Sequence, residues 1–148
     1  MLTVTTAPHG EIDTHALFIG SGRACFEQAV TPVSYTHLVA YEAHCRTFEL
    51  AFKANLKIGV GTDFFPGPDN ALEMEFLAGL GMDPMAVIQA ATKTGAEVLM
   101  RNDIGTLDKG KLADIILVSG NPLKNMGLLR RTENVKVVMQ GGKIVKQL

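Results

Sequence analysis

The chain has 148 residues, 47% hydrophobic and 20% charged, which fits one domain with a real core and excludes a disordered chain. Its 14 basic and 15 acidic residues give a formal net charge of −1, so no nucleic acid or anionic membrane partner is expected. We expect neither a membrane span, which needs about 18 apolar residues, nor a secretion signal. The two cysteines, Cys25 and Cys45, form no CxxC pair and indicate reduced thiols in the cytoplasm.

Residues 1–38 give few structural signals. The sequence HALFI at 15–19 predicts a short buried strand, and the segment 21–30 fits a loop leading into one or two helical turns. Pro32 then disfavours helix at the residue before it. Because the composition changes near residue 38, we treat 1–38 as a separate segment.

Helices and a strand alternate after residue 38. Residues 39–55 have apolar side chains at helical spacing, and residues 57–62 predict a short strand without strict alternation, as in a parallel sheet buried on both faces. Helices are predicted at 70–80 and from 83 to about 100. Their start signals are a capping-box variant, Asn70 with Glu73, and an N-cap followed by proline, Asp83 with Pro84. This alternation predicts an α/β unit.

The end of the chain is rich in β-structure. Residues 113–118 form a compact apolar run, and residues 135–145 predict a hairpin that turns at Gly141 and Gly142, where positive φ is needed twice.

Asp63 is the main candidate for chemistry. It follows Gly61 and Thr62 at the carboxyl end of the strand predicted at 57–62. Ligands and catalytic side chains gather at that edge in barrels and open parallel sheets. An Asx-turn or a helix cap in a surface loop is the alternative for an aspartate in this position.

Several stretches together resemble the C-terminal part of the amidohydrolase superfamily. They are AHCRTFELAFKANLKIGVGTDF, MDPMAVIQAATKTGAEVL, IGTLDKGKLADIILVSGNPL and VKVVMQGGKIV, in uninterrupted order between residues 39 and 148. The most specific pieces are Gly61-Thr62-Asp63 and the Gly105 to Asp114 stretch that precedes a β-run. The subgroup that the chain resembles is that of imidazolonepropionase-like enzymes, including relatives that cleave Xaa-Pro dipeptides.

The resemblance implies a partial (β/α)8 barrel, with its last units in residues 39–103 and a flanking β-sandwich segment in residues 104–148. It implies a metal-dependent hydrolase of C–N bonds in amides, lactams or dipeptides, with zinc as the divalent metal. In such enzymes the aspartate matched by Asp63 contacts the metal and passes a proton from the attacking water to the leaving nitrogen. The metal lowers the pKa of its water to about 7 and polarises the substrate carbonyl.

The family's metal centre also uses an HxH pair on the first strand, and here Asp13 and His15 stand at those positions. We therefore take His15 as a second candidate metal ligand, because side chains two apart on a strand share a face. The alternative is a histidine at a strand edge with no ligand role. A complete barrel needs about 250 residues, so the middle of the family sequence is absent from this chain.

The remaining polar residues of note are expected to be structural. Lys111 and Asp114 are predicted to serve turns and packing, and His44 is expected to be a hydrogen-bonded helix histidine. Glu73 and Glu75 are expected to be cap and solvated-face charges.

Two hypotheses of different class follow. The chain is the C-terminal portion of a small-molecule hydrolase, or it is a truncated or chimeric α/β domain without activity. The sequence VSYTHL at 33–38 resembles translated sequencing-adaptor DNA and motivates the chimera. Strand edges and apolar surface left open by the absent barrel units invite a homo-oligomer.

Overall fold

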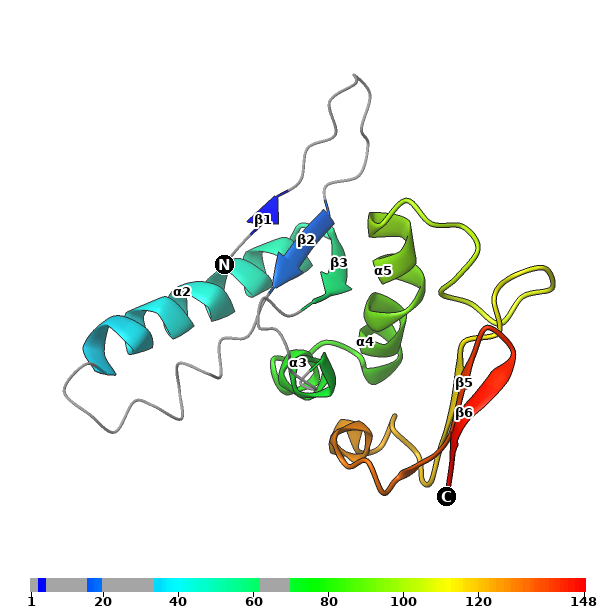
Figure 1. The fold of residues 1–148 in the computed structure, drawn as a ribbon. Helices are drawn as coiled ribbons and strands as arrows, with labels where there is room; N and C mark the ends of the chain where they lie inside the picture. Colours follow the sequence, from blue (N-terminus) through cyan, green and yellow to red (C-terminus); the bar gives the residue numbers. More distant parts are fainter. Residues whose placement is uncertain (1–2, 5–15, 20–33, 62–69) are drawn as a thin grey trace.

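Two small sheets lie on either side of a group of helices (Figure 1). The computed structural model describes residues 3–4, 16–19, 34–61 and 70–148, with side-chain burial from residue 42 onward. Among the described residues, no helix has the length and apolar character required to cross a membrane.

The first sheet has the order β1-β2-β3, formed by Thr3–Val4, Ala16–Ile19 and Lys57–Val60. β1 pairs antiparallel with β2, whereas β2 and β3 run parallel from Ala16 opposite Lys57 to Ile19 opposite Val60. Parallel neighbours require a crossover, and helix α2 (Ser34–Lys53) lies in the connection between them. The predicted parallel character of the strand from Lys57 is therefore confirmed.

Helix α2 begins earlier than the sequence predicts. It starts at Ser34 rather than at residue 39 and continues without a break past the division we placed after residue 38. Pro32 still precedes its first residue, which agrees with the bias of proline against helix on its N-terminal side. The division of the chain at residue 38 stays a prediction.

The prediction of one continuous helix from residue 83 to about 100 is wrong. It forms as α4 (Pro84–Ala91) and α5 (Lys93–Val98), after helix α3 (Asn70–Gly79) in the predicted place. The break is at Thr92, whose φ of −124° and ψ of −89° are not helical. Its Oγ1 donates to the carbonyl oxygen of Ile88 at 2.7 Å, a back-bond that bends helices.

The predicted start of α4 is confirmed. Asp83 Oδ1 accepts hydrogen bonds from the backbone N–H groups of Met85 at 2.9 Å and Ala86 at 3.2 Å, and Pro84 is the first helical residue. The carboxylate thus satisfies donors that have no partner inside the helix.

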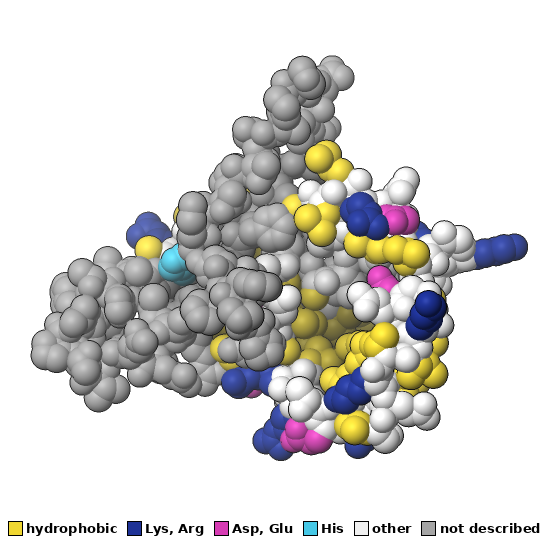
Figure 2. Space-filling model, viewed as in Figure 1, with side chains coloured by type: hydrophobic (Ala, Val, Ile, Leu, Met, Phe, Trp, Pro, Cys, Tyr) yellow, Lys and Arg dark blue, Asp and Glu magenta, His cyan; other side chains and the backbone are white. Residues whose placement is uncertain are grey.

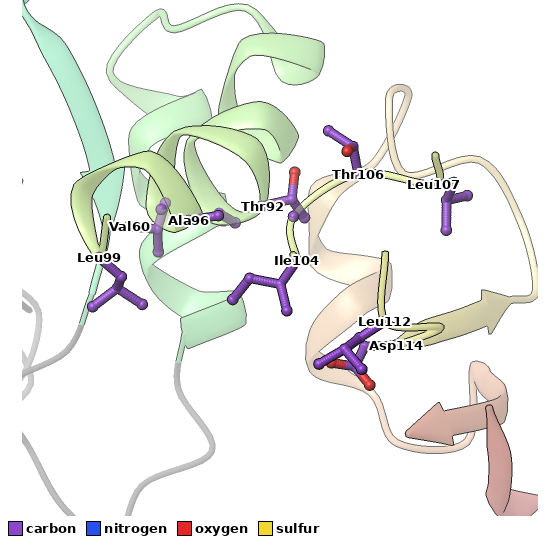
Figure 3. Close-up of a pocket in the computed structure, with 12 residues that line it drawn as sticks. Val60, Thr92, Ala96, Leu99, Ile104, Thr106, Leu107, Leu112 and Asp114 are labelled. Carbon is purple, nitrogen blue, oxygen red and sulfur yellow. The ribbon is translucent and has the colours of Figure 1, made fainter. Parts of the chain in front are cut away.

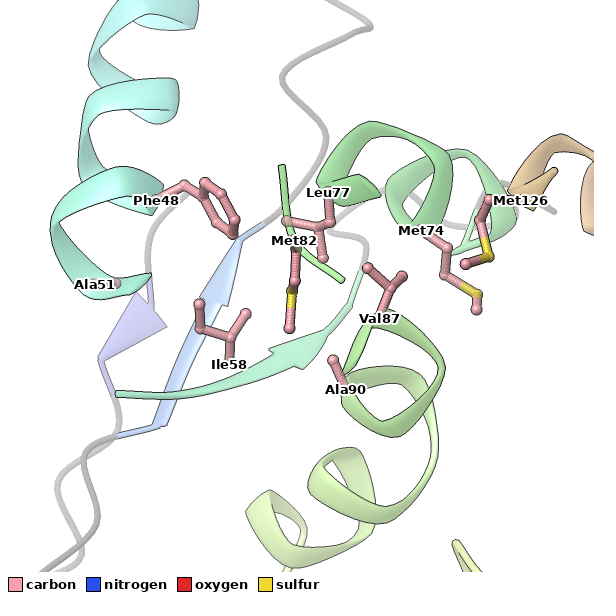
Figure 4. Packing of buried hydrophobic residues seen from close by; sticks show 9 residues of the cluster. All are labelled: Phe48, Ala51, Ile58, Met74, Leu77, Met82, Val87, Ala90 and Met126. Carbon is pink, nitrogen blue, oxygen red and sulfur yellow. The ribbon is translucent and has the colours of Figure 1, made fainter. Parts of the chain in front are cut away.

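The core joins α2, β3, α3, α4 and the segment after β4 (Figure 4). Ile58 of β3 lies in one buried cluster with Phe48 of α2, Leu77 of α3 and Val87 of α4. The Phe48 ring also stacks on Phe52, with 5.7 Å between ring centroids. The buried members of the cluster are Phe48, Ala51, Ile58, Met74, Leu77, Met82, Val87, Ala90 and Met126.

The second sheet has the order β4-β5-β6, formed by Ile115–Val118, Val135–Gln140 and Lys143–Gln147. The predicted hairpin is confirmed, with φ of 54° at Gly141 and 81° at Gly142. β4 starts two residues later than predicted. The Asp114 carboxylate accepts the Gly141 N–H at 2.7 Å, so this residue ties the strand entry to the hairpin turn instead of joining the ladder.

The C-terminal segment is attached to the helices through Met126 and through Gly105, among other contacts. Met126, in the short helix η1 (Met126–Arg130), is buried in the common core next to α3. Gly105, with φ of 87°, lies so close to α5 that an added Cβ would be 2.7 Å from Ala96 Cβ and 2.9 Å from the Thr92 oxygen.

Gly105→Ala is expected to destabilise the fold more than Gly110→Ala. Both glycines have positive φ, which costs an L-residue about 1–2 kcal/mol, but a Cβ at Gly110 meets nothing within 4 Å. Overpacking against Ala96 adds about 1–3 kcal/mol to the loss at Gly105. Urea unfolding of both variants measures the difference, and equal losses would show that Gly105 is not tightly packed.

Candidate active site

The carboxyl ends of β2 and β3 meet at one edge of the first sheet, where Ile19 lies opposite Val60. Asp63 follows Val60 by three positions in the sequence and itself lies outside the described residues. The described strand ends at Val60, two residues before the predicted end at residue 62. Asp63 follows the carboxyl end of this strand in the sequence, which is the end where functional residues lie in parallel sheets.

His15 also lies outside the described residues, directly before Ala16, the first residue of β2. Ala16 pairs with Lys57 at the amino ends of the two strands. The described strands therefore do not by themselves bring the positions of His15 and Asp63 to one edge, and each residue needs a separate test.

β3 is fixed in place by burial and by one ion pair. Ile58 is buried in the common core, and Lys57 Nζ donates to Glu97 Oε2 of α5 at 3.0 Å. This hydrogen bond holds the pKa of Glu97 below its ordinary value. β3, the strand that precedes Asp63 in the sequence, is thus joined to α5.

The two glutamates of α3 lie in different surroundings. Glu73, which is expected to cap the helix, is buried, with 2% of its surface exposed. Glu75 Oε2 lies 3.1 Å from Arg130 Nη1 of η1 and links α3 to the C-terminal segment. The spacing along the helix gave no signal for either result, because both depend on what packs against α3.

His44 is half-buried on α2, and among the side chains that the structure describes its Nδ1 is buried without a hydrogen-bond partner. The expectation of a fully hydrogen-bonded histidine is wrong at this nitrogen. Lys111 and Asp114 behave as predicted, since Asp114 accepts from Gly141 and Lys111 lies 3.7 Å from Asp108.

The described residues contain no group of three or more His, Cys, Asp or Glu side chains that could hold a metal ion. The candidates Asp63 and His15 would supply an oxygen and a nitrogen, which are donor types that zinc accepts. A catalytic zinc site commonly has three protein ligands. These two candidates would therefore form an incomplete ligand set.

A cavity of about 370 Å³ lies between the helices and the C-terminal segment (Figure 3). Val60 and Ala96 line one end, and Leu112 and Asp114 line the other. Its polar groups already have partners in the fold, as Thr92 Oγ1 donates to Ile88 and Asp114 accepts from Gly141. This cavity is lined for apolar packing and does not assemble a catalytic group.

Solved structures with the same fold identify the class of protein. Aspergillus niger ochratoxinase matches 86% of this chain with a TM-score of 0.76 and 30% identity. A Xaa-Pro dipeptidase with bound methionine matches 84% with a TM-score of 0.74 and 30% identity. The chain covers 30% and 32% of those structures. Such neighbours have a TIM-barrel-type fold, of which this chain holds a part.

The family follows from the sequence. Residues 27–145 match the Amidohydrolase family, and the chain belongs to this family. Ochratoxinase of Aspergillus niger is 33% identical over 111 residues, and imidazolonepropionase of Shouchella clausii is 29% identical over 99 residues. The chain spans 22% of the length of both relatives. The predicted resemblance is confirmed, and the α/β class with it.

Replacing Lys57 by methionine is expected to raise the pKa of Glu97 toward its ordinary value, because the hydrogen bond that favours the carboxylate is lost. With the pKa lowered in the folded state, the stabilising effect of the pair is present above the unfolded-state pKa. It is lost as the pH falls through the folded-state pKa.

NMR titration of the Glu97 carboxyl carbon measures the shift. Lys53→Met is the matched control, since Lys53 pairs with Glu49 and not with Glu97. A Glu97 pKa that stays unchanged in Lys57→Met would contradict the assigned cause.

Proposed function

We propose that this chain is the part of a metal-dependent amidohydrolase that carries the catalytic aspartate, Asp63, for hydrolysis of a C–N bond. The single observation behind this is that Asp63 follows the carboxyl end of a parallel strand in a chain of the Amidohydrolase family. The substrate class proposed is a small amide, lactam or dipeptide. Zinc as the metal and a cytoplasmic location belong to the same proposal.

Asp63 would transfer a proton during the reaction. A carboxylate near the reacting centre can accept a proton from water and deliver it to the nitrogen that leaves. This requires that the carboxyl be ionised when water attacks and protonated when the C–N bond breaks. An asparagine in its place keeps the size of the side chain and cannot carry the proton.

A divalent cation would be held by Asp63, with His15 as the second candidate ligand, and would supply Lewis-acid chemistry when bound. Because these two residues form an incomplete set of metal ligands, the remaining ligands have to come from residues other than these two. His15 directly precedes β2 in the sequence, whereas Asp63 follows the carboxyl end of β3. The role of His15 as a ligand is therefore tested with a separate variant.

The second candidate function is a non-catalytic α/β domain. It is favoured by the share of the relatives that the chain covers, 22%. A homo-oligomer formed through open strand edges belongs to this alternative.

In the chain combined with polypeptide that supplies the remaining ligands, Asp63→Asn is expected to lower hydrolysis of amide and dipeptide substrates by at least about a hundredfold if Asp63 is the proton carrier. Zinc content measured by mass spectrometry is expected to fall in the same variant. His15→Ala tests the second ligand by the same zinc measurement.

Asp108→Asn is the matched control, because Asp108 is an exposed aspartate in the loop before β4 whose partners, Thr106 and Lys111, lie within three residues of it. It is expected to retain zinc and activity. A wild-type protein with neither zinc nor hydrolysis when it is combined with polypeptide that supplies the remaining ligands, with metal added, would reject the enzyme in favour of the non-catalytic domain.

A further inference from the structure

The cavity of about 370 Å³ beside α5 has no part in the proposed reaction (Figure 3). It lies between the helices and the segment that runs from residue 104 to β4, and the end of β3 contributes to one side of it. Most of its described wall is apolar. The apolar side chains that the argument uses are Val60, Ala91, Ala96, Leu99, Ile104 and Leu112.

The polar side chains of the wall are already engaged in hydrogen bonds. Thr92 Oγ1 donates at 2.7 Å to the backbone carbonyl oxygen one turn earlier in α4, and Thr106 Oγ1 donates to Asp108 Oδ2 at 2.6 Å. Asp114 Oδ1 accepts the Gly141 N–H at 2.7 Å. A molecule in this cavity would therefore gain its binding free energy from apolar contacts more than from new hydrogen bonds.

The charges around the cavity favour a neutral molecule. Asp114 is the one charged residue in the described wall, and its carboxylate would repel an anion. A cation would compete for that carboxylate with Arg101, whose pKa is raised by the hydrogen bond to Asp103 and also by the charge of Asp114. Either ion would also lose hydration on entering an apolar space, whereas a neutral molecule would not meet this cost.

The volume and the opening of the cavity suit a small aromatic molecule. Benzene fits a dry apolar cavity of about 150 Å³, and sites for small molecules commonly have about 300–1,000 Å³. Leu99 and Leu107 line the cavity and are 63% and 78% exposed, so its wall reaches the surface and a molecule can enter without unfolding. Figure 2 shows hydrophobic side chains gathered in a hollow between the helices and the C-terminal sheet.

We propose that this cavity is a binding site for a small neutral molecule that carries an aromatic or branched apolar group. The molecule would contact Val60 at the end of β3, Ala96 of α5 and Leu112 before β4, which are three separate parts of the chain. Bound there, it would join the C-terminal segment to the helices and stabilise the folded state by mass action. The site does not rest on the function proposed for Asp63, because binding requires neither a metal nor a reaction.

The experiment uses toluene as the probe, with benzoate and benzylammonium as charged molecules that carry the same ring. The full 148-residue chain is titrated, and NMR follows its methyl groups. Saturable shifts are expected with toluene at Val60, Ala96, Ile104 and Leu112, and the urea midpoint of unfolding is expected to rise with toluene concentration. Both charged molecules are expected to bind at least about tenfold more weakly, because entering the cavity strips water from their charge.

Ile104→Trp is expected to fill part of the cavity and to weaken toluene binding at least about tenfold. Ile116→Trp is the matched control, because Ile116 is 52% exposed on β4 and does not line the cavity. Leu112→Trp, with Leu117→Trp as its control, forms a second pair that keeps the test decisive should Ile104→Trp not fold. Circular dichroism verifies the fold of each variant.

Three results would overturn the proposal. One is a set of shifts that do not saturate with toluene, which would mean that the cavity holds no defined site. Another is equal weakening within a matched pair of variants, or shifts centred on Leu117 and Ile144, which would place the probe on the exposed second sheet. The third is tighter binding of benzylammonium than of toluene, which would make Asp114 the main partner in place of the apolar wall.

Discussion

The burial of Ile58 in the cluster that also contains Phe48 of α2 and Val87 of α4 is the constraint on which the rest of the structure depends. It holds β3 against the helices that precede and follow it in the sequence, so one short strand organises most of the core. Fully burying a side chain of this size stabilises by about 1.5–3 kcal/mol. The direction of β3, and with it the place where the chain continues toward Asp63, follows from this packing and from the parallel pairing with β2.

The C-terminal segment depends on the same core but contributes little to it. Met126 enters the cluster from η1, Arg130 pairs with Glu75 of α3, and Gly105 packs against α5. The sheet beyond these contacts remains outside the core. A family fold that needs several more layers is thus represented here by one well-packed group of helices and one sheet without a cover.

Local signals in the sequence were sufficient for local structure. The Asp83 cap, the proline after it and the two glycines of the hairpin each act within a few residues, and each was found where it was predicted. The burial of Glu73 depends on tertiary packing, which neighbours in sequence do not reveal. The break at Thr92 accompanies a local hydrogen bond from its Oγ1 to the Ile88 carbonyl oxygen, which the helical pattern of residues 83–100 did not indicate. Asp63 could be nominated from the end of its strand, whereas His15 was nominated only through the family resemblance.

The contacts that attach the C-terminal segment to the helices also affect how the molecule responds to proteolytic cleavage. Leu107 to Gly110 lies between Gly105 and β4 as an exposed tip, the kind of place that proteases enter first. A cut there breaks the backbone before β4. Met126 and Arg130 of η1, which follow β4, still hold the C-terminal segment against α3. The nicked protein would stay in one piece under native conditions and separate only when the helices unfold.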